Sequence, residues 1–320
     1  MELEEPLKAM FITDTHLVGP HKGYWLDKLR TDWQMHRAYT SAVQIHKPEI
    51  IFILGDLFDE GERCSRNQFQ EYVDRFHSLF PNPENVKMFV VPGNHDIGFH
   101  YSVKRERFDR FNSAFNATVV EWFKMKGNHF VLINSMALEQ DECFMCSEAK
   151  RLIERLSKQL NAAKDLSPKS KMNHSRPVLL QHFPMFRKSD EICNEPDEAS
   201  VKVKKELFRE KWDCLSKDAS QLLYDSINPR VIITGHTHHG CHVIHRKNIH
   251  EYTVSSFSWR NKNNPNFMLG IFTSNNYSVK KCDLPRQSTV IIVYCLGLIS
   301  SICYYFRFKI SDFIFFLFKL

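Results

Sequence analysis

Five short apolar runs in this chain each end at a side chain that can bind a metal ion, and this pattern constrains the fold most. The runs and the residues that follow them are 9–13 with Asp14 and His16, 50–54 with Asp56, 88–92 with Asn94, 177–181 with His182, and 231–235 with His236 and His238. Short continuous apolar runs bounded by turns are typical of buried strands. Because open α/β sheets collect their chemistry beyond the carboxyl ends of their strands, we expect the five turns to meet in one crevice.

The expected crevice contains two Asp, one Asn and four His side chains, and no Cys. Imidazole together with carboxylate and amide oxygen suits Mn, Fe or Zn, whereas an all-oxygen set would favour Mg or Ca. Seven ligands are too many for one ion, and they fit two divalent ions about 3.5–4 Å apart that share a carboxylate. Asp56 is the expected shared ligand, because the tight turn at Gly55 directs its carboxylate into the crevice.

Each of these motifs is weak when taken alone. Residues 93–96, with the sequence Gly-Asn-His-Asp, also fit a simple turn, because Asn and Gly tolerate left-handed backbone angles. Of the 16 His in the chain, we assign a metal or catalytic function to five and treat most of the others as structural or solvent-exposed. The presence of all five motifs in order, each closing an apolar run, favours a metal centre over chance.

Between its ends the chain is expected to form one α/β domain, residues 8–285, after an N-terminal extension of residues 1–7. Apolar runs alternate with amphipathic stretches, which is typical of α/β architecture. One helix is expected to begin with Thr31 or Asp32 as its N-cap and to end before Pro48. The other expected helices cover residues 67–80, 103–115, 147–163 and 216–227, and the polar stretches 164–176 and 189–205 are expected to be surface loops.

The far C-terminus is the one sharp change in composition. Residues 288–306 hold no charge and are rich in Val, Ile, Leu and aromatic residues. The length of this run is close to the roughly 20 residues that cross a bilayer as a helix. A buried C-terminal helix of the domain is the alternative. Residues 307–320 are expected to form a short tail, with residues 313–318 at the membrane interface.

Composition narrows the class of protein further. The mean hydropathy of −0.37 excludes a polytopic membrane protein but allows a single span. The net charge of +6 is mild and spread along the chain, so we expect no nucleic-acid partner.

In their order and spacing the five motifs resemble the calcineurin-like metallophosphoesterase superfamily, over residues 8 to about 260. The resemblance implies an α/β fold in which two β-sheets are flanked by helices, a four-layer α/β/β/α sandwich with both metals at one edge. It implies two ligand sets that share Asp56, the first with Asp14, His16 and His238, and the second with Asn94, His182 and His236. His95 would then face the substrate phosphate, stabilising the transition state or protonating the leaving oxygen, and Asp59 would orient its imidazole.

Three further segments are similar to the branch of that superfamily that remodels GPI anchors, namely residues 98–101, 146–148 and 256–265. This narrower resemblance implies a Mn²⁺-dependent phosphodiesterase that removes ethanolamine phosphate from the second mannose of GPI anchors. Its partners would be GPI-anchored proteins and a membrane, in the early secretory pathway from endoplasmic reticulum exit sites through the intermediate compartment to the Golgi. His100, Trp259 and Arg260 are the candidate substrate-binding residues, with Trp259 stacking on a sugar and Arg260 contacting phosphate.

The membrane orientation is open at this point. The acidic start, residues 1–6, shows no signal peptide, so the domain either faces the cytosol or has lost an upstream segment, and we favour the second interpretation with a lumenal domain. The sequons at Asn116, Asn173 and Asn276 are compatible with a lumenal domain, and the Cys143–Cys146 spacing suits a disulfide or a zinc half-site.

Two rival functions remain. One is a cytosol-facing metallophosphatase or nucleotide phosphodiesterase that uses the same metals. The other is a non-catalytic interaction module, which would be expected to lack some ligands or His95, whereas the sequence retains all of them.

Overall fold

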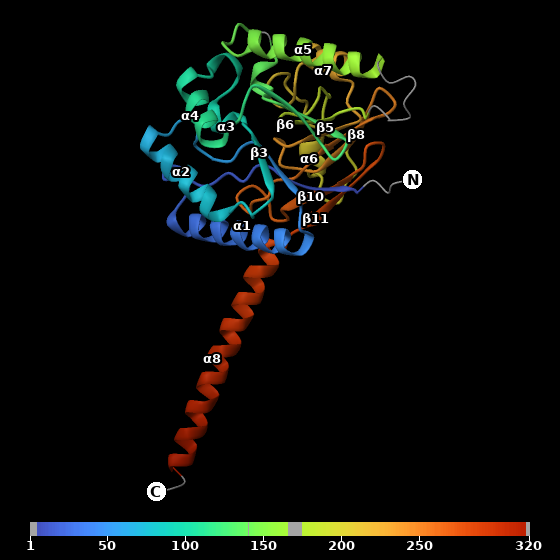
Figure 1. Ribbon diagram of the computed structural model, residues 1–320. Helices are drawn as coiled ribbons and strands as arrows, with labels where there is room; N and C mark the ends of the chain where they lie inside the picture. Colours follow the sequence, from blue (N-terminus) through green and yellow to red (C-terminus); the bar gives the residue numbers. More distant parts are fainter. Residues whose placement is uncertain (1–4, 140, 166–174, 318–320) are drawn as a thin grey trace.

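Two facing β-sheets, helices on their outer sides and one long projecting helix make up the molecule (Figure 1). The computed structural model describes residues 5–139, 141–165 and 175–317. The predicted α/β metallophosphoesterase sandwich is therefore confirmed, with both sheets and their helical cover in place.

The first sheet has five strands in the order β11-β10-β1-β2-β3. β1, β2 and β3 are parallel, whereas β10 runs antiparallel to β1 and β11 antiparallel to β10. The three parallel strands bring the first three predicted motifs to one edge of this sheet. The strands are β1 (Leu7–Ile12), β2 (Ile50–Leu54), β3 (Lys87–Val91), β10 (Asn266–Phe272) and β11 (Tyr277–Asp283).

The second sheet has six strands in the order β4-β5-β6-β7-β9-β8. β5, β6, β7 and β9 are parallel, and the two edge strands, β4 and β8, are antiparallel to their neighbours. The remaining two motifs follow β6 and β7. The strands are β4 (Val120–Met125), β5 (Asn128–Ile133), β6 (Val178–Gln181), β7 (Val231–Thr234), β8 (Cys241–His245) and β9 (Ile249–Thr253).

An aromatic layer fills the space between the sheets. Phe11 and Phe52 of the first sheet are stacked with their ring centroids 5.2 Å apart, and Phe52 lies 5.2 Å from Phe130 of the second sheet. Alternate residues of β1 point the other way, so that Met10 and Ile12 pack in the outer core under the helices. This two-residue period buries both faces of the strand and fixes its register.

Helices cover the outer face of each sheet, α1 and α2 on the first and α5 and α7 on the second (Figure 1). The expected helices of the domain are present. Their bounds are α1 (Trp25–His46), α2 (Arg66–Leu79), α3 (Asn94–Ile97), α4 (Arg105–Phe115), α5 (Cys146–Asp165), α6 (Val201–Lys204) and α7 (Lys217–Ile227), with single 3₁₀ turns at His100–Ser102 and Ser135–Ala137.

The predicted start of the first helix is wrong. α1 begins at Trp25 with Tyr24 as its N-cap, and the backbone N–H of Tyr24 donates to the Asp27 carboxylate at 3.4 Å. The apolar residues of its first two turns, Trp25, Leu26 and Leu29, are exposed, so an amphipathic pattern directed at the core could not reveal this start.

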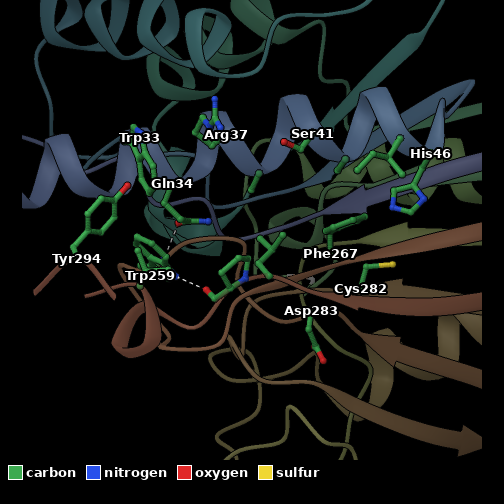
Figure 2. Close-up of a pocket in the computed structure, with 16 residues that line it drawn as sticks. Trp33, Gln34, Arg37, Ser41, His46, Trp259, Phe267, Cys282, Asp283 and Tyr294 are labelled. Atoms are coloured by element: carbon green, nitrogen blue, oxygen red, sulfur yellow. Dashed lines mark hydrogen bonds between the residues drawn. The ribbon is translucent and has the colours of Figure 1, made fainter. Parts of the chain in front are cut away.

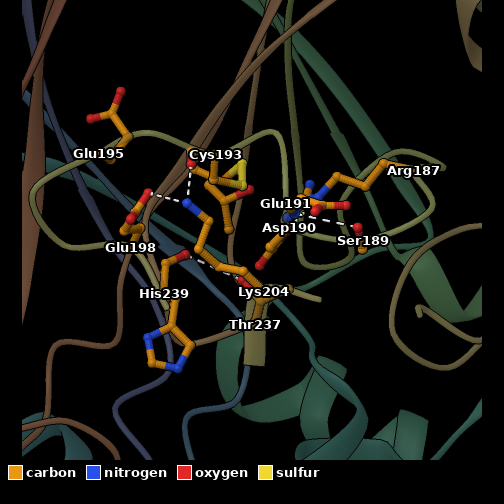
Figure 3. The surroundings of a disulfide bond; sticks show 12 residues. Arg187, Ser189, Asp190, Glu191, Cys193, Glu195, Glu198, Lys204, Thr237 and His239 are labelled. Carbon is orange, nitrogen blue, oxygen red and sulfur yellow. Dashed lines mark hydrogen bonds and ion pairs between the residues drawn. A yellow bond between two sulfur atoms is a disulfide. The ribbon is translucent and has the colours of Figure 1, made fainter. Parts of the chain in front are cut away.

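The expectation of a surface loop over residues 189–205 holds only in part, because residues 201–204 form α6 and several residues before it are buried. Cys193 is bonded to Cys241 at the start of β8 (Figure 3). Asp197 is buried. The Asp197 carboxylate accepts hydrogen bonds from Ser255 and Asn266 and pairs with Lys281 at 2.9 Å. This polar segment is thus fixed to β10 and β11 of the first sheet by one buried acid and to β8 of the second sheet by one covalent bond. The expected loop over 164–176 lies mostly outside the described residues.

The predicted apolar run forms α8 (Gln287–Leu317), which leaves the domain beside α1 and projects alone (Figure 1). The segment Gln287–Arg307 is long and apolar enough to cross a membrane, and none of it is buried against the domain. The alternative of a buried C-terminal helix is therefore excluded. The helix continues beyond residue 306, where the separate tail was expected to begin.

Replacing both Cys193 and Cys241 by Ser should lower the free energy of unfolding by roughly 2–4 kcal/mol, because the bond closes a long loop of the unfolded chain. These cysteines are 48 residues apart, whereas the bonded pair Cys143 and Cys146 is separated by 3 and serves as the matched control. Urea denaturation of the full chain in detergent, under non-reducing conditions, measures both losses. A loss in the Cys143→Ser/Cys146→Ser control as large as in the Cys193→Ser/Cys241→Ser variant would contradict the prediction.

Candidate metal centre

Five loops that follow β1, β2, β3, β6 and β7 converge at one end of the two sheets. Five of the seven predicted ligands have a positive backbone φ, which non-glycine residues adopt rarely and at an energetic cost. The residues and angles are Asp14 (53°), His16 (41°), Asp56 (52°), His236 (74°) and His238 (62°). Left-handed geometry at so many adjacent turns indicates that the surrounding fold holds these side chains in a set direction.

Two glycines allow the loops to approach one another. Gly55 has a φ of +89°, and a Cβ atom at this position would lie 2.5 Å from His182 Nδ1. A Cβ atom on Gly93 would collide with the carboxylate and the backbone nitrogen of Asp56. The turns after β2 and β3 and the His182 side chain can therefore come together only because these positions lack side chains.

The first predicted ligand set comes together. One atom each from Asp14, His16, Asp56 and His238 lies within 4.8 Å of all the others. The Nε2 atoms of His16 and His238 are 3.1 Å apart. Two imidazole nitrogens this close repel each other unless a proton or a cation lies between them.

The second set comes together around the same carboxylate. Asp56, His182 and His236 each contribute one atom to a group within 4.8 Å. Asp56 Oδ2 lies 3.3 Å from His182 Nε2 and 3.5 Å from His16 Nε2, so it faces both sets. This is the position that the predicted shared ligand requires.

Each of several ligands uses one polar atom for a protein contact and leaves another without a partner. His182 Nδ1 contacts the Leu54 carbonyl at 2.7 Å, and His236 Nε2 contacts the Trp212 carbonyl at 2.7 Å. Asp14 Oδ2 accepts from Thr13 Oγ1 at 2.7 Å and from the His236 N–H at 3.0 Å. Hydrogen bonds made by the ligand atoms that point away from a metal fix the tautomer and the orientation of the ligands.

The opposite atoms of the same residues are buried and lack a hydrogen-bond partner among the described residues. They are Asp14 Oδ1, Asn94 Oδ1, His182 Nε2 and His236 Nδ1. Unpaired polar atoms are costly in a protein interior, and a cation at each set would satisfy them. The residues present therefore fit two divalent ions.

The charge of the centre agrees with this fit. Burial alone would lower the pKa of His16, but the adjacent carboxylates of Asp14 and Asp59 outweigh burial and raise that pKa to about 10. Burial likewise opposes protonation of His182, yet the Asp56 carboxylate raises its pKa to about 9. The buried carboxylates thus attract positive charge, which protons supply when no other cation is bound.

His95 lies at the mouth of the centre, with its side chain 32% exposed. Its ring is positioned by Asp59 in a way that differs from the expectation. His95 Nδ1 contacts the Asp59 backbone carbonyl at 3.1 Å, whereas the Asp59 carboxylate is 3.9 Å away. That carboxylate lies closer to His16 Nδ1, at 3.4 Å, because Arg260 and Lys22 hold it on that side.

A pocket of about 530 Å³ opens over the centre. Asp56, Asn94, His95, His236 and His238 form its floor. Its walls include Phe99 and residues of the segment 203–213, among them Glu206 and Trp212. The ligands are thus reachable by a substrate considerably larger than phosphate.

The three candidate substrate residues are not gathered in this pocket. Trp259 is 6% exposed and packs against Trp33, with its Nε1–H donating to the Pro285 carbonyl at 3.0 Å. His100 is buried and contacts the Lys211 carbonyl. Arg260 pairs with Asp59 at 3.0 Å, so it acts on the centre through that carboxylate. Burial leaves neither Trp259 nor His100 a face to offer a sugar at the metals.

Sequence reasoning missed the groups that orient the ligands and the wall of the pocket. The carbonyls of Leu54 and Trp212 belong to the backbone, so no residue type marks them. Trp212 was unnoticed because it lies in an irregular segment outside the five motifs.

Comparison with known proteins agrees with the geometry. The family described as calcineurin-like phosphoesterase matches residues 7–240. Metallophosphoesterase 1 of Xenopus laevis is 46% identical over 304 residues, which cover 90% of this chain and 75% of that protein. Metallophosphoesterase 1 homolog of Drosophila melanogaster is 45% identical over 291 residues, which cover 89% of this chain and 78% of that protein.

Among solved structures, a dimetal phosphatase from Danio rerio superposes with a TM-score of 0.55 at 15% identity, covering 88% of this chain and 98% of that one. Identity this low supports the fold alone. The family match and the relatives show that the chain belongs to the calcineurin-like phosphoesterase family. It is accordingly a metal-dependent phosphoesterase, and the donor set indicates a dinuclear divalent centre.

We predict that the chain binds two divalent ions and that Asp56→Asn loses both, because Asp56 faces both sets. Ion binding should raise the thermal midpoint of the wild type, since the ions bind only the folded state, and acidification should release them as protons compete for the imidazoles. Elemental analysis and thermal denaturation with and without chelator measure these effects.

Asp225→Asn is the matched control, because Asp225 is exposed and pairs only with surface groups such as Arg246 at 2.8 Å. It should retain the ion content of the wild type. Full ion content in Asp56→Asn would remove Asp56 from the shared position.

Proposed function

We propose that this phosphoesterase removes ethanolamine phosphate from the second mannose of GPI anchors, using two Mn²⁺ ions, in the early secretory pathway. One observation carries the hydrolytic part of the proposal: buried unpaired atoms of Asp14, Asn94, His182 and His236 surround a carboxylate that faces both sets, beneath an open pocket. The substrate and the compartment rest on the resemblance of residues 98–101, 146–148 and 256–265 and on the relatives named Metallophosphoesterase 1.

Two ions held by these ligands would neutralise the phosphoryl oxygens and supply a nucleophile at neutral pH. The protein contributes the direction of attack, because the positive-φ turns fix the ligands before substrate arrives. The mixed nitrogen and oxygen donor set is compatible with Mn²⁺.

His95 is the group of the chain that is placed to act on the leaving oxygen. The Asp59 carbonyl can only accept, so His95 Nδ1 carries a hydrogen in that contact. The ring lines the pocket, which leaves Nε2 for the substrate. In its doubly protonated form the ring donates from Nε2 to the phosphate or to the departing alkoxide.

The pocket wall suits a substrate that carries sugar and an ammonium group. Glu206 provides a carboxylate and Trp212 an aromatic face, 41% exposed, on the segment that borders the centre. An ammonium is attracted to a carboxylate such as that of Glu206, whereas the Trp212 ring already has the Arg209 guanidinium over it, 5.8 Å from its centroid. The carboxylate thus supports ethanolamine phosphate as the group that is removed.

A lumenal domain anchored by α8 is the arrangement we propose. Two disulfide bonds, Cys143–Cys146 and Cys193–Cys241, favour an oxidising compartment. Asn116 and Asn276 of the predicted sequons are exposed, whereas Asn173 lies outside the described residues. These observations speak against the cytosol-facing alternative.

We predict that His95→Ala keeps both ions and loses turnover by about 10²–10⁴-fold, the usual contribution of a general acid. The loss should fall on kcat with a soluble phosphodiester as substrate. Elemental analysis of the same preparation separates this effect from metal loss. Wild-type turnover in His95→Ala would remove its assignment.

For the substrate, we predict that cells lacking this protein retain ethanolamine phosphate on the second mannose of their GPI anchors. Wild-type chain should restore its removal, whereas Asp56→Asn should not, because the ions are lost. Mass spectrometry of released GPI glycans measures the group directly. An unchanged glycan in the deficient cells would leave a phosphoesterase that acts on another substrate.

A further inference from the structure

The outer side of α1 exposes large apolar side chains where a water-facing helix would carry polar ones. Tyr24 is 83% exposed, Trp25 75%, Leu26 58% and Leu29 59%, and Trp33 continues the same side of the helix at 44%. Contiguous exposed apolar surface of this kind marks an interaction site. In the described chain α1 is the first helix, and its apolar side is directed away from both sheets.

α8 passes directly beside this surface. Trp33 contacts Tyr294 of α8 edge-on, with the ring centroids 6.4 Å apart. The two rings and Trp259 close one end of an apolar groove of about 510 Å³ between α1, the C-terminal end of β11 and the first turns of α8 (Figure 2). The apolar side of α1 is therefore continuous with the helix that can cross a membrane.

The length of α8 sets the depth of this contact. Residues 288–306 carry no charge and, at about 1.5 Å per residue, extend about 28 Å, close to the roughly 30 Å of a bilayer core. Tyr294 lies six residues into this run, about 9 Å along the helix from its start. If α8 shifted towards the domain side until Trp33 was in water, Arg307 would move from the opposite membrane surface into the hydrocarbon core. Such a buried charge is costly.

The charges of α1 agree with a lipid surface. Lys28 and Arg37 are exposed on the helix, and Lys47 is exposed at its C-cap. The acidic residues are engaged elsewhere, Asp27 with Arg30 at 3.3 Å and Asp32 with Arg75 at 2.7 Å. A helix with bulky apolar side chains and free basic groups is typical of one that lies in the interfacial layer of a membrane.

We propose that α1 is a second membrane contact of this protein: its exposed apolar side, Tyr24 to Trp33, lies at the boundary between the headgroups and the acyl chains of the bilayer that α8 spans. The groove beside it then opens to lipid, and the exposed rings of Trp33 and Tyr294 form an aromatic anchor at the interface. The inference rests on the proposed anchoring by α8 and is independent of which phosphoester is cleaved.

One side chain, Gln34, links α1 to the metal centre through hydrogen bonds. Gln34 Nε2 donates to the Phe257 carbonyl at 3.0 Å, and its Oε1 accepts from the Trp259 N–H at 3.0 Å. The Phe257 N–H donates to the carbonyl of Thr13, the neighbour of Asp14, at 3.0 Å. α1 thus holds the centre at a fixed position relative to the lipid surface.

The test is tryptophan quenching by brominated lipid. The full chain is reconstituted into phosphatidylcholine vesicles with bromine near the top of the acyl chains. Trp25→Phe should lose a major share of the quenching seen in the wild type. Trp122→Phe is the matched control, because Trp122 is 39% exposed on β4, in the second sheet, and should lose none.

A second variant tests the contact without relying on emission. Trp25→Ser/Leu29→Ser should lower turnover of a vesicle-bound phosphoester and leave turnover of a soluble one unchanged, since neither residue lines the pocket over the centre. Ile244→Ser, with Ile244 54% exposed on β8, should alter neither rate.

Resistance to extraction by alkaline carbonate distinguishes the anchoring by α8 from the contact by α1. A chain that is washed off the vesicles overturns the anchoring and this inference together. The other result is a chain that resists carbonate while wild type and Trp25→Phe show the same quenching. This result would keep the anchoring by α8 and overturn the contact by α1. Cross-linking between copies through α1, with no quenching of Trp25, would assign the surface to a second copy and likewise overturn the inference.

Discussion

The Asp56 carboxylate is the group on which the arrangement of this centre depends. It is buried, it lies 3.3–3.5 Å from imidazole nitrogens on either side, and its pKa is held well below the usual range by those imidazoles despite burial. A negative charge in this position requires positive charge beside it. Because its neighbours come from both sheets, cations bound here also join β1, β2 and β3 to β6 and β7.

The need to bring positively charged or cation-binding groups to Asp56 also explains the positive φ angles around it. Left-handed turns at Asp14, Asp56 and His236 raise the free energy of the fold locally. The aromatic layer between the sheets and the packing of the helices outside them provide the compensating stability. A rigid core thus permits a centre whose ligands are aligned in advance.

The ligands could be predicted from sequence because each follows a buried strand, and parallel strands end at a common edge. Other features could not. The sequence pattern places the start of α1 too late because Trp25, Leu26 and Leu29 face outward, whereas apolar periodicity indicates residues that face the core. The residue type of Trp259 suggests sugar binding, yet its environment is decided by Trp33 and Pro285, which are distant in sequence. Contacts between distant segments carry no local signature.

The pair of hydrogen bonds made by Gln34 has a consequence for selectivity. If α1 rests on lipid as proposed, ions bound at the centre would stay at one distance from the bilayer, because the short chain of hydrogen bonds through Phe257 leaves little room for movement. A phosphoester nearer to or farther from the acyl chains would miss the ions even if its chemistry were identical. Such an enzyme would select its substrate by the distance of the phosphoester from the membrane as well as by the shape of the substrate.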